Sequence, residues 1–157
     1  MLGVAELPGE GTDFLEAAVT ASNERLRGTL GANIVVHPRT RRAMGADFDR
    51  QVARLRYGTI GINVWTALGY LTPYATWGAF PGHSLDDVQS GRGVVHNALL
   101  LEGTERTVVT GPFTPRPKPP WFVDNRTAAT TGRRLASFAA RPRWSALPGI
   151  FASALRG

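Results

Sequence analysis

The residues of this sequence that could carry out chemistry are few, and their spacing does not match that of known catalytic or metal sites. Three histidines, His37, His83 and His96, and the neighbouring carboxylates Asp86 and Asp87 are the candidate acids, bases or ligands. Their separations lack the short, regular intervals at which histidine and carboxylate side chains bind zinc. We therefore expect no metal site and no catalytic histidine. His37 precedes a proline at the end of a predicted strand, and we expect it to face solvent.

Nucleophilic and phosphate-binding motifs are also missing. The sequence has no cysteine, which excludes a thiol nucleophile and a disulfide. Ser84 and Ser90 do not lie in the G-x-S-x-G turn that exposes a nucleophilic serine. The glycines of residues 78–82 and 91–93 fit neither G-x-G-x-x-G after a strand nor a P-loop. The chain by itself is therefore not expected to be a hydrolase or to bind a nucleotide.

The first 65 residues alternate between strand and helix patterns. Short apolar runs bounded by turn residues predict strands over residues 2–7, 29–36 and 59–65. Apolar side chains three or four residues apart predict helices over residues 12–28 and 43–56. This order predicts an α/β fold, a partial parallel sheet with crossover helices. A sheet of three strands has uncovered edges and faces, so we expect a further element or a partner to cover them.

The periodic patterns weaken after residue 65. Residues 66–93 are rich in glycine and aromatic side chains and predict a long loop that lines a pocket or an interface, with a helical turn capped by Ser84. Residues 94–101 fit a helix or a strand, and residues 106–110 predict a short strand. A Pro-rich linker at residues 112–120 precedes an arginine-rich helix at 127–140 and a short apolar tail at 147–155. We therefore divide the chain into residues 1–111 and residues 112–157.

The formal net charge of +6 belongs to the C-terminal third of the chain. Residues 106–157 carry nine basic side chains and one acidic side chain, whereas residues 1–105 carry a small excess of acidic ones. The basic cluster consists of Arg126, Arg133, Arg134, Arg141 and Arg143. Few aromatic residues on which bases could stack accompany it, Trp144 among them, so the pattern is more typical of a solvated helix than of a nucleic-acid groove.

Neither a secretory signal nor a membrane segment is visible. Residues 1–10 lack a basic region followed by an apolar run, and no apolar stretch approaches the roughly 20 residues that a membrane helix needs. We therefore expect a cytoplasmic protein with no membrane partner.

Four segments in residues 2–111 resemble aldehyde dehydrogenases, in the order in which that family has them. Residues 14–19 (FLEAAV) with Asn23 and residues 28–32 are similar to a helix reading A-V-x-x-A-N that leads through glycine into a strand. Residues 55–63 (LRYGTIGIN) look like the family's L-x-x-G-T-V-x-V-N strand. The loop at 75–82 with residues 89–91 resembles P-F-G-G-x-K-x-S-G, although it carries an insertion and lacks the lysine. Residues 106–110 (RTVVT) are similar to the family's terminal oligomerisation strand, K-T-V-T-V.

The resemblance implies the C-terminal part of an aldehyde dehydrogenase, which ends the catalytic domain and adds the oligomerisation strand. In that family a cysteine thiolate attacks the aldehyde, a hydride passes to NAD or NADP, and a glutamate assists hydrolysis. The sequence has neither that cysteine nor a nucleotide-binding domain, so we expect it to bind no cofactor alone and to be inactive by itself. The aldehyde and NAD or NADP then belong to an intact enzyme.

The resemblance also places candidate residues on the strand and loop that it matches. It implies that Trp65, Leu71, Trp77 and Phe80 line an aldehyde tunnel, with packing in the core as the alternative. Asn63 ends the matched strand, and we expect its amide to satisfy backbone groups of the loop.

Three functional hypotheses follow. In the first, the chain is a truncated or split product of an aldehyde dehydrogenase-like protein. In the second, it is a non-catalytic module whose sheet edge pairs with a second copy or with a full-length relative. In the third, it binds an anion or a nucleic acid through residues 106–157, although a nucleic acid is not the expected partner.

Overall fold

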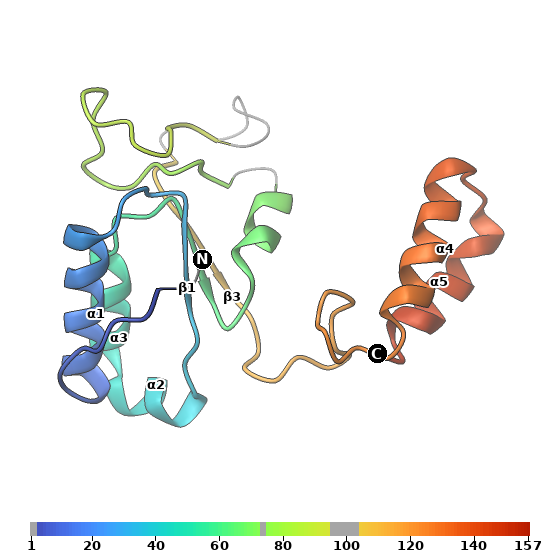
Figure 1. Ribbon diagram of the computed structural model, residues 1–157, viewed down its shortest axis with the longest axis horizontal. Helices are drawn as coiled ribbons and strands as arrows, with labels where there is room; N and C mark the ends of the chain where they lie inside the picture. The colour runs from blue at the N-terminus through green and yellow to red at the C-terminus, as the bar shows by residue number, and fades with distance from the viewer. Residues whose placement is uncertain (1–2, 73–74, 95–103) are drawn as a thin grey trace. The chain divides into compact units, whose positions relative to one another are not determined.

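The computed structural model describes residues 3–72, 75–94 and 104–157 (Figure 1). The chain divides into two compact units, Met1–Phe113 and Thr114–Gly157, which are described separately. The first unit combines helices with one parallel sheet of three strands, in the order β1-β2-β3. The predicted α/β class is thereby confirmed.

Strand β2 (Thr59–Ile62) lies at the centre of the sheet, between β1 (Gly31–Ile34) and β3 (Thr107–Thr110). Ile60 is opposite Ala32 on one side and opposite Val108 on the other. All four residues of β2 are buried, whereas the two outer strands are partly exposed. The outer strands are edges of the sheet within the described residues, and their outward backbone groups are available for pairing.

One face of the sheet is covered by α1 (Gly11–Arg25) and α3 (Ala46–Arg54), which lie side by side in Figure 1. The spacing of apolar residues explains this packing, because one stripe of each helix is buried. The hydrophobic core consists of Leu15, Val19, Val36, Phe48, Val52, Leu55, Tyr57, Ile60 and Ile62.

The other face of β2 is approached by a short 3₁₀ helix, η1 (Thr66–Leu71). A Cβ atom at Gly69 would lie 2.6 Å from Cγ2 of Thr59, so the backbone of η1 comes close to the strand only because residue 69 is glycine. A parallel sheet needs cover on both faces, and η1 supplies part of it.

The helix predicted over residues 43–56 corresponds to α3, and residues 43 and 44 belong instead to a separate helix, α2 (Pro38–Met44). Gly45 separates them with a φ of 56°, which interrupts the helical backbone. Helix α2 was not predicted; Nδ1 of His37 accepts a hydrogen bond from the N–H of Arg39 and caps its first turn. The proline at position 38 starts this helix rather than only ending the strand before it.

Two further expectations for local structure were wrong. Residues 3–7 of the strand predicted at 2–7 form no strand, since no described strand offers them a ladder of hydrogen bonds. Residues 84–87 form no helical turn, and only residues 85 and 86 form a bend. Most of the ambiguous segment at 94–101 lies outside the described residues.

The second unit contains α4 (Ala128–Ala140), η2 (Trp144–Ala146) and α5 (Leu147–Ala154). Helices α4 and α5 pack together, with Thr131, Ile150 and Ser153 buried. The side chain of Asn125 joins the preceding proline-rich segment to α4, because Nδ2 donates to the Lys118 carbonyl and Oδ1 accepts from the N–H of Thr127. None of the helices in the described part of the chain is long and apolar enough to cross a membrane.

The C-terminal end of α3 is capped by Arg106, which immediately precedes β3. Its guanidinium donates to the carbonyl oxygens of Val52, Ala53 and Leu55, at 3.4, 2.8 and 2.6 Å. These carbonyls lie at the negative end of the helix dipole, where a cation is favourable. Burial lowers the pKa of Arg106, opposed by the charge of Glu105, yet arginine stays protonated across the accessible pH range.

Replacement of Arg106 should therefore destabilise the first unit. Arg106→Met keeps an apolar stem but leaves three carbonyls without their charged donor, and we expect the free energy of unfolding to fall by about 2 kcal/mol. Urea unfolding followed by circular dichroism measures the change. Arg27→Met, at an exposed arginine in the connection after α1, is the matched control and should stay within about 0.5 kcal/mol of the parent. Equal stability of both variants would contradict the capping role of Arg106.

Candidate functional site

The carboxyl ends of β1 and β2 are joined by Asn63, which directly follows β2. Its N–H donates to the Ile34 carbonyl at 2.8 Å. Its side chain pairs with both backbone groups of Val36, because Oδ1 accepts from the N–H at 2.8 Å and Nδ2 donates to the carbonyl at 3.0 Å. Asn63 has a φ of 56°, a left-handed conformation that asparagine adopts more readily than most residues. The amide thus satisfies the backbone of Val36 at the point where β2 turns away.

Two of the predicted tunnel residues lie at the two ends of η1, since Trp65 immediately precedes this helix and Leu71 is its last residue. Trp65 is 54% exposed and Leu71 is 77% exposed. The turn into η1 is fixed by Asn33 on β1, whose Oδ1 accepts from the N–H of Thr66 at 3.0 Å. Trp65 and Leu71 therefore present apolar surface to solvent rather than filling the core of this unit.

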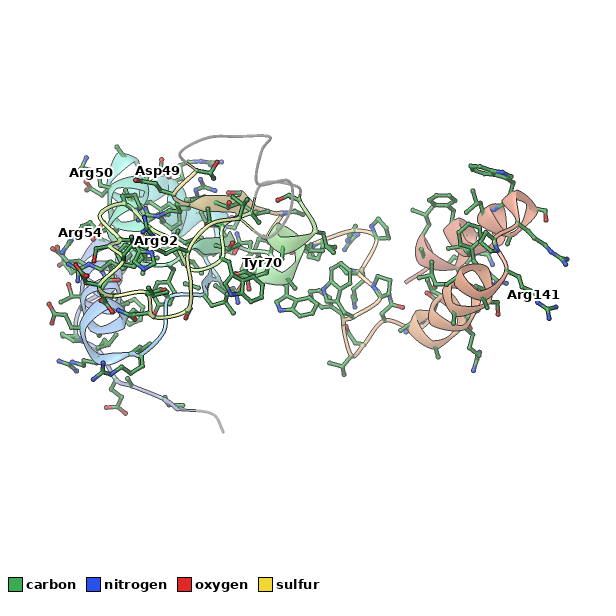
Figure 2. The ribbon with its side chains drawn as sticks, turned by 90° about the horizontal axis from the view of Figure 1, so that it is seen from above. Asp49, Arg50, Arg54, Tyr70, Arg92 and Arg141 are labelled. Atoms are coloured by element: carbon green, nitrogen blue, oxygen red, sulfur yellow. The ribbon has the colours of Figure 1, made fainter. Side chains whose placement is uncertain are left out.

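Trp77, the third predicted tunnel residue, packs against η1. Its ring lies 5.5 Å from the ring of Tyr70, whose hydroxyl donates to the Leu30 carbonyl at 2.6 Å (Figure 2). Burial raises the pKa of Tyr70, so the hydroxyl remains a donor at neutral pH. A Cβ atom at Gly91 would lie 2.7 Å from Cδ1 of Trp77, which places the indole directly on that turn. Trp77 therefore connects η1 with the later part of the loop, and 45% of it remains exposed.

Phe80, the fourth predicted tunnel residue, is 9% exposed and stacks on His83 with ring centroids 4.8 Å apart. It lines a cavity of about 50 Å³ together with residues at the end of α1, Tyr57 and Gln89. A cavity of this size has room for water rather than for an organic substrate, which needs several hundred Å³. Trp65, Leu71 and Trp77 are not among the residues that line it.

Buried threonines attach the loop to the amino ends of the central and edge strands. The Thr76 hydroxyl donates to the Gly58 carbonyl at 2.5 Å, and the Thr59 hydroxyl donates to the Thr76 carbonyl at 3.2 Å. The N–H of Thr76 donates to Oγ1 of Thr107 at 3.3 Å. A Cβ atom at Gly58 would lie 2.3 Å from the nitrogen of Gly78, so the two backbones touch. The loop is thus fixed to the sheet by backbone contacts that tolerate no larger residue at position 58.

The described histidines are held by local contacts. His37 caps α2, and its ring lies 5.2 Å from that of Phe113, edge to face. Nε2 of His83 lies 2.7 Å from the Asp87 carbonyl oxygen. His96 lies outside the described residues. Among the residues that the structure describes, no group of three histidine, cysteine or carboxylate side chains could hold a metal ion.

Asn23 has a structural role that no sequence pattern predicts. Its Nδ2 donates to the Arg54 carbonyl at 2.8 Å, and its Oδ1 accepts from the N–H of Arg56 at 2.9 Å. This amide joins the end of α1 to the segment between α3 and β2. Its position within the resembling A-V-x-x-A-N segment was the one available signal. Asn23 and Asn63 therefore serve the same purpose at two places, since each satisfies backbone groups that no regular element pairs.

The described part of the first unit is a small parallel α/β unit with a glycine-rich and aromatic loop fixed across its sheet. No protein-family model, curated protein or solved structure matches the chain. Its function is therefore inferred from its residues and its fold.

Substitutions of Asn63 should separate hydrogen bonding from backbone strain. Asn63→Leu loses both side-chain hydrogen bonds and forces a branched residue into a left-handed conformation, so we expect a loss of about 3 kcal/mol in the free energy of unfolding. Asn63→Gly loses the same hydrogen bonds without the strain, and we expect a loss smaller by about 1 kcal/mol. Urea unfolding measures both.

Gln89→Leu is the matched control for these variants. Gln89 also has a positive φ, of 43°, but among the described residues its amide bonds only to the exposed carboxylate of Asp87. Glutamine and leucine are similarly disfavoured at this φ, so the exchange adds little strain, and we expect the free energy of unfolding to change by no more than about 0.5 kcal/mol. If Asn63→Leu costs no more than Gln89→Leu, the hydrogen bonds to Val36 do not hold the two strands together.

Proposed function

We propose that the chain is the C-terminal segment of an aldehyde dehydrogenase-like oxidoreductase and does not oxidise aldehydes by itself. The observation that carries the proposal is the place of the LRYGTIGIN segment in the fold. It supplies the central strand β2 and ends on Asn63, whose amide orders the backbone at the carboxyl end of the sheet. Ligands of parallel α/β sheets bind at this end of the strands.

The order of the elements gives further support. The segments that resemble the family supply α1 and β1, then β2, then the loop, and finally β3. The matched loop is fixed to the sheet, since Thr76 is hydrogen bonded to residues of β2 and β3. The exposed indole of Trp65 and the exposed side chain of Leu71, at the two ends of η1, offer apolar surface that another part of an intact enzyme could cover.

The chemistry of aldehyde oxidation indicates which steps this chain cannot supply. Aldehyde oxidation requires a thiolate that adds to the carbonyl carbon, a nicotinamide that takes the hydride, and water that releases the acid and restores the thiol. The chain contains no cysteine. In this proposal Trp65, Leu71, Trp77 and Phe80 form part of the wall around the aldehyde, and NAD or NADP is bound by the rest of the intact enzyme.

The purified 157-residue chain should therefore show no dehydrogenase activity. We expect no reduced nicotinamide above background when it is mixed with NAD or NADP and a panel of aliphatic and aromatic aldehydes. Robust turnover would overturn the proposal, because it would require a different nucleophile.

Sequencing the DNA upstream of the Met1 codon tests the family assignment separately. We expect coding sequence there, in the same or a shifted frame, with a nucleophilic cysteine, and its absence would count against the assignment.

The second candidate is a module that associates through a sheet edge, and β3 provides the observation that favours it. No described strand pairs with the outer side of β3, and Val108 at its centre is 48% exposed. The N–H groups of Thr107 and Gly111 donate to the carbonyls of Gly58 and Ile62. Because backbone groups alternate along a strand, the N–H of Val108 points away from β2 and is available to a second copy or a related dehydrogenase subunit.

A proline at position 108 should test this edge without breaking the sheet. Val108→Pro removes the outward N–H but none of the hydrogen bonds to β2, so we expect the fold to persist and any self-association or pairing with a full-length relative to weaken at least tenfold. Native mass spectrometry measures the complexes, and Val108→Ile, which keeps the N–H, is the control. Two results would remove this candidate. The parent chain could remain monomeric both alone and mixed with a full-length relative, or Val108→Pro could associate as well as the parent chain does.

A further inference from the structure

A cavity of about 560 Å³ lies within the unit Thr114–Gly157, between α4 and the segment that runs from its end into α5. Its charged and hydroxyl lining consists of Arg133, Arg134, Arg141, Arg143, Ser137 and Ser145. The ring of Phe138 forms part of its apolar wall. Four arginines therefore line one pocket that is open to solvent, in the part of the chain that the aldehyde dehydrogenase resemblance leaves unexplained.

Little in this unit neutralises those arginines. Asp124 is the one acidic side chain of residues 114–157, and Lys118 pairs with it at 2.6 Å; this hydrogen bond lowers the pKa of Asp124. Arg134 donates to the Gly149 carbonyl. In the described part of the chain, the side chains of Arg133, Arg141 and Arg143 make no hydrogen bond or ion pair. Figure 2 shows Arg141 on this unit, with its side chain extending away from the helices.

We propose that this cavity binds a compact phosphate-bearing anion, of the class of diphosphates and organic phosphate esters. Guanidinium groups bind phosphate oxygens in pairs of parallel hydrogen bonds, and serine hydroxyls can donate further ones. A diphosphate carries roughly the charge that three unpaired arginines would balance. The volume lies in the range of small-molecule sites, and Phe138 gives an organic substituent an apolar surface. The site is independent of the dehydrogenase proposal.

The distribution of charge favours a small anion over a nucleic acid. A nucleic-acid groove needs a continuous basic track with aromatic side chains on which bases can stack. Arg116, Lys118 and Arg126 do not line the cavity, and Phe138 is the one aromatic residue in its lining. Four of the unit's arginines therefore line one pocket instead of following a strand of phosphates.

Isothermal titration of the full chain with inorganic pyrophosphate tests the site. We expect one binding site per chain, with an affinity that falls as salt is added. Arg141→Gln combined with Arg143→Gln should weaken binding at least tenfold, whereas Arg116→Gln combined with Arg126→Gln, outside the cavity, should change it less than twofold. Arg143→Lys keeps the charge but loses the paired geometry and should give an intermediate loss. Circular dichroism of each variant checks that α4 and α5 remain folded.

Two further titrations, one with lipid vesicles and one with duplex DNA, complete the test, and the vesicles identify the source of the phosphate. Binding to vesicles that contain phosphatidic acid, displaced by pyrophosphate, would support the same site with a lipid headgroup as its ligand; absence of vesicle binding would support a free phosphate compound. Three results would overturn the proposal: no binding of pyrophosphate, equal losses in the two double variants, or tight binding of duplex DNA that pyrophosphate does not displace.

Discussion

The first unit depends on the pairing of β2, which is hydrogen bonded along both edges and buried at all four residues. Ile60 and Ile62 pack into the core beneath α1 and α3, while Thr59 meets η1 on the other face. At Gly61 a Cβ atom would lie 2.4 Å from the Val64 carbonyl oxygen. The strand therefore combines branched side chains on one face with a residue that has none on the other.

Local patterns were sufficient to predict most of the longer regular elements of the chain. The strands at 31–34, 59–62 and 107–110 and the helices at 11–25 and 128–140 lie in or near the predicted ranges, because each presents an apolar periodicity of its own. The break at Gly45 was not predicted, since one glycine in an amphipathic pattern does not by itself show that the φ angle becomes positive there. The strand expected at 2–7 failed for a different reason, because a strand exists only where another strand pairs with it.

The candidate site was less predictable, because its geometry depends on contacts between segments far apart in the sequence. The resemblance singled out Leu71 and Phe80 together, yet Leu71 is exposed and Phe80 is buried, since burial in the loop follows from the attachment of Thr76 and Gly78 to the sheet. The partner of Asn63 is likewise a backbone group on another strand. In the basic tail, the sequence predicted a solvated helix. Arg133 lies on α4 and is exposed, whereas Arg141 and Arg143 lie beyond the end of α4, and only the structure shows that all three line one pocket.

The long connection between Ile62 and Thr107 has a consequence for how the chain can change. The entropy cost of closing a loop rises only with the logarithm of its length, so a doubling adds about 0.6 kcal/mol. The parallel pairing of β2 with β3 therefore restricts which residues can stand at the two ends of the connection. It restricts the length of the connection much less. Insertions and deletions are expected to accumulate there, provided that Thr76 still reaches Gly58 and Thr107.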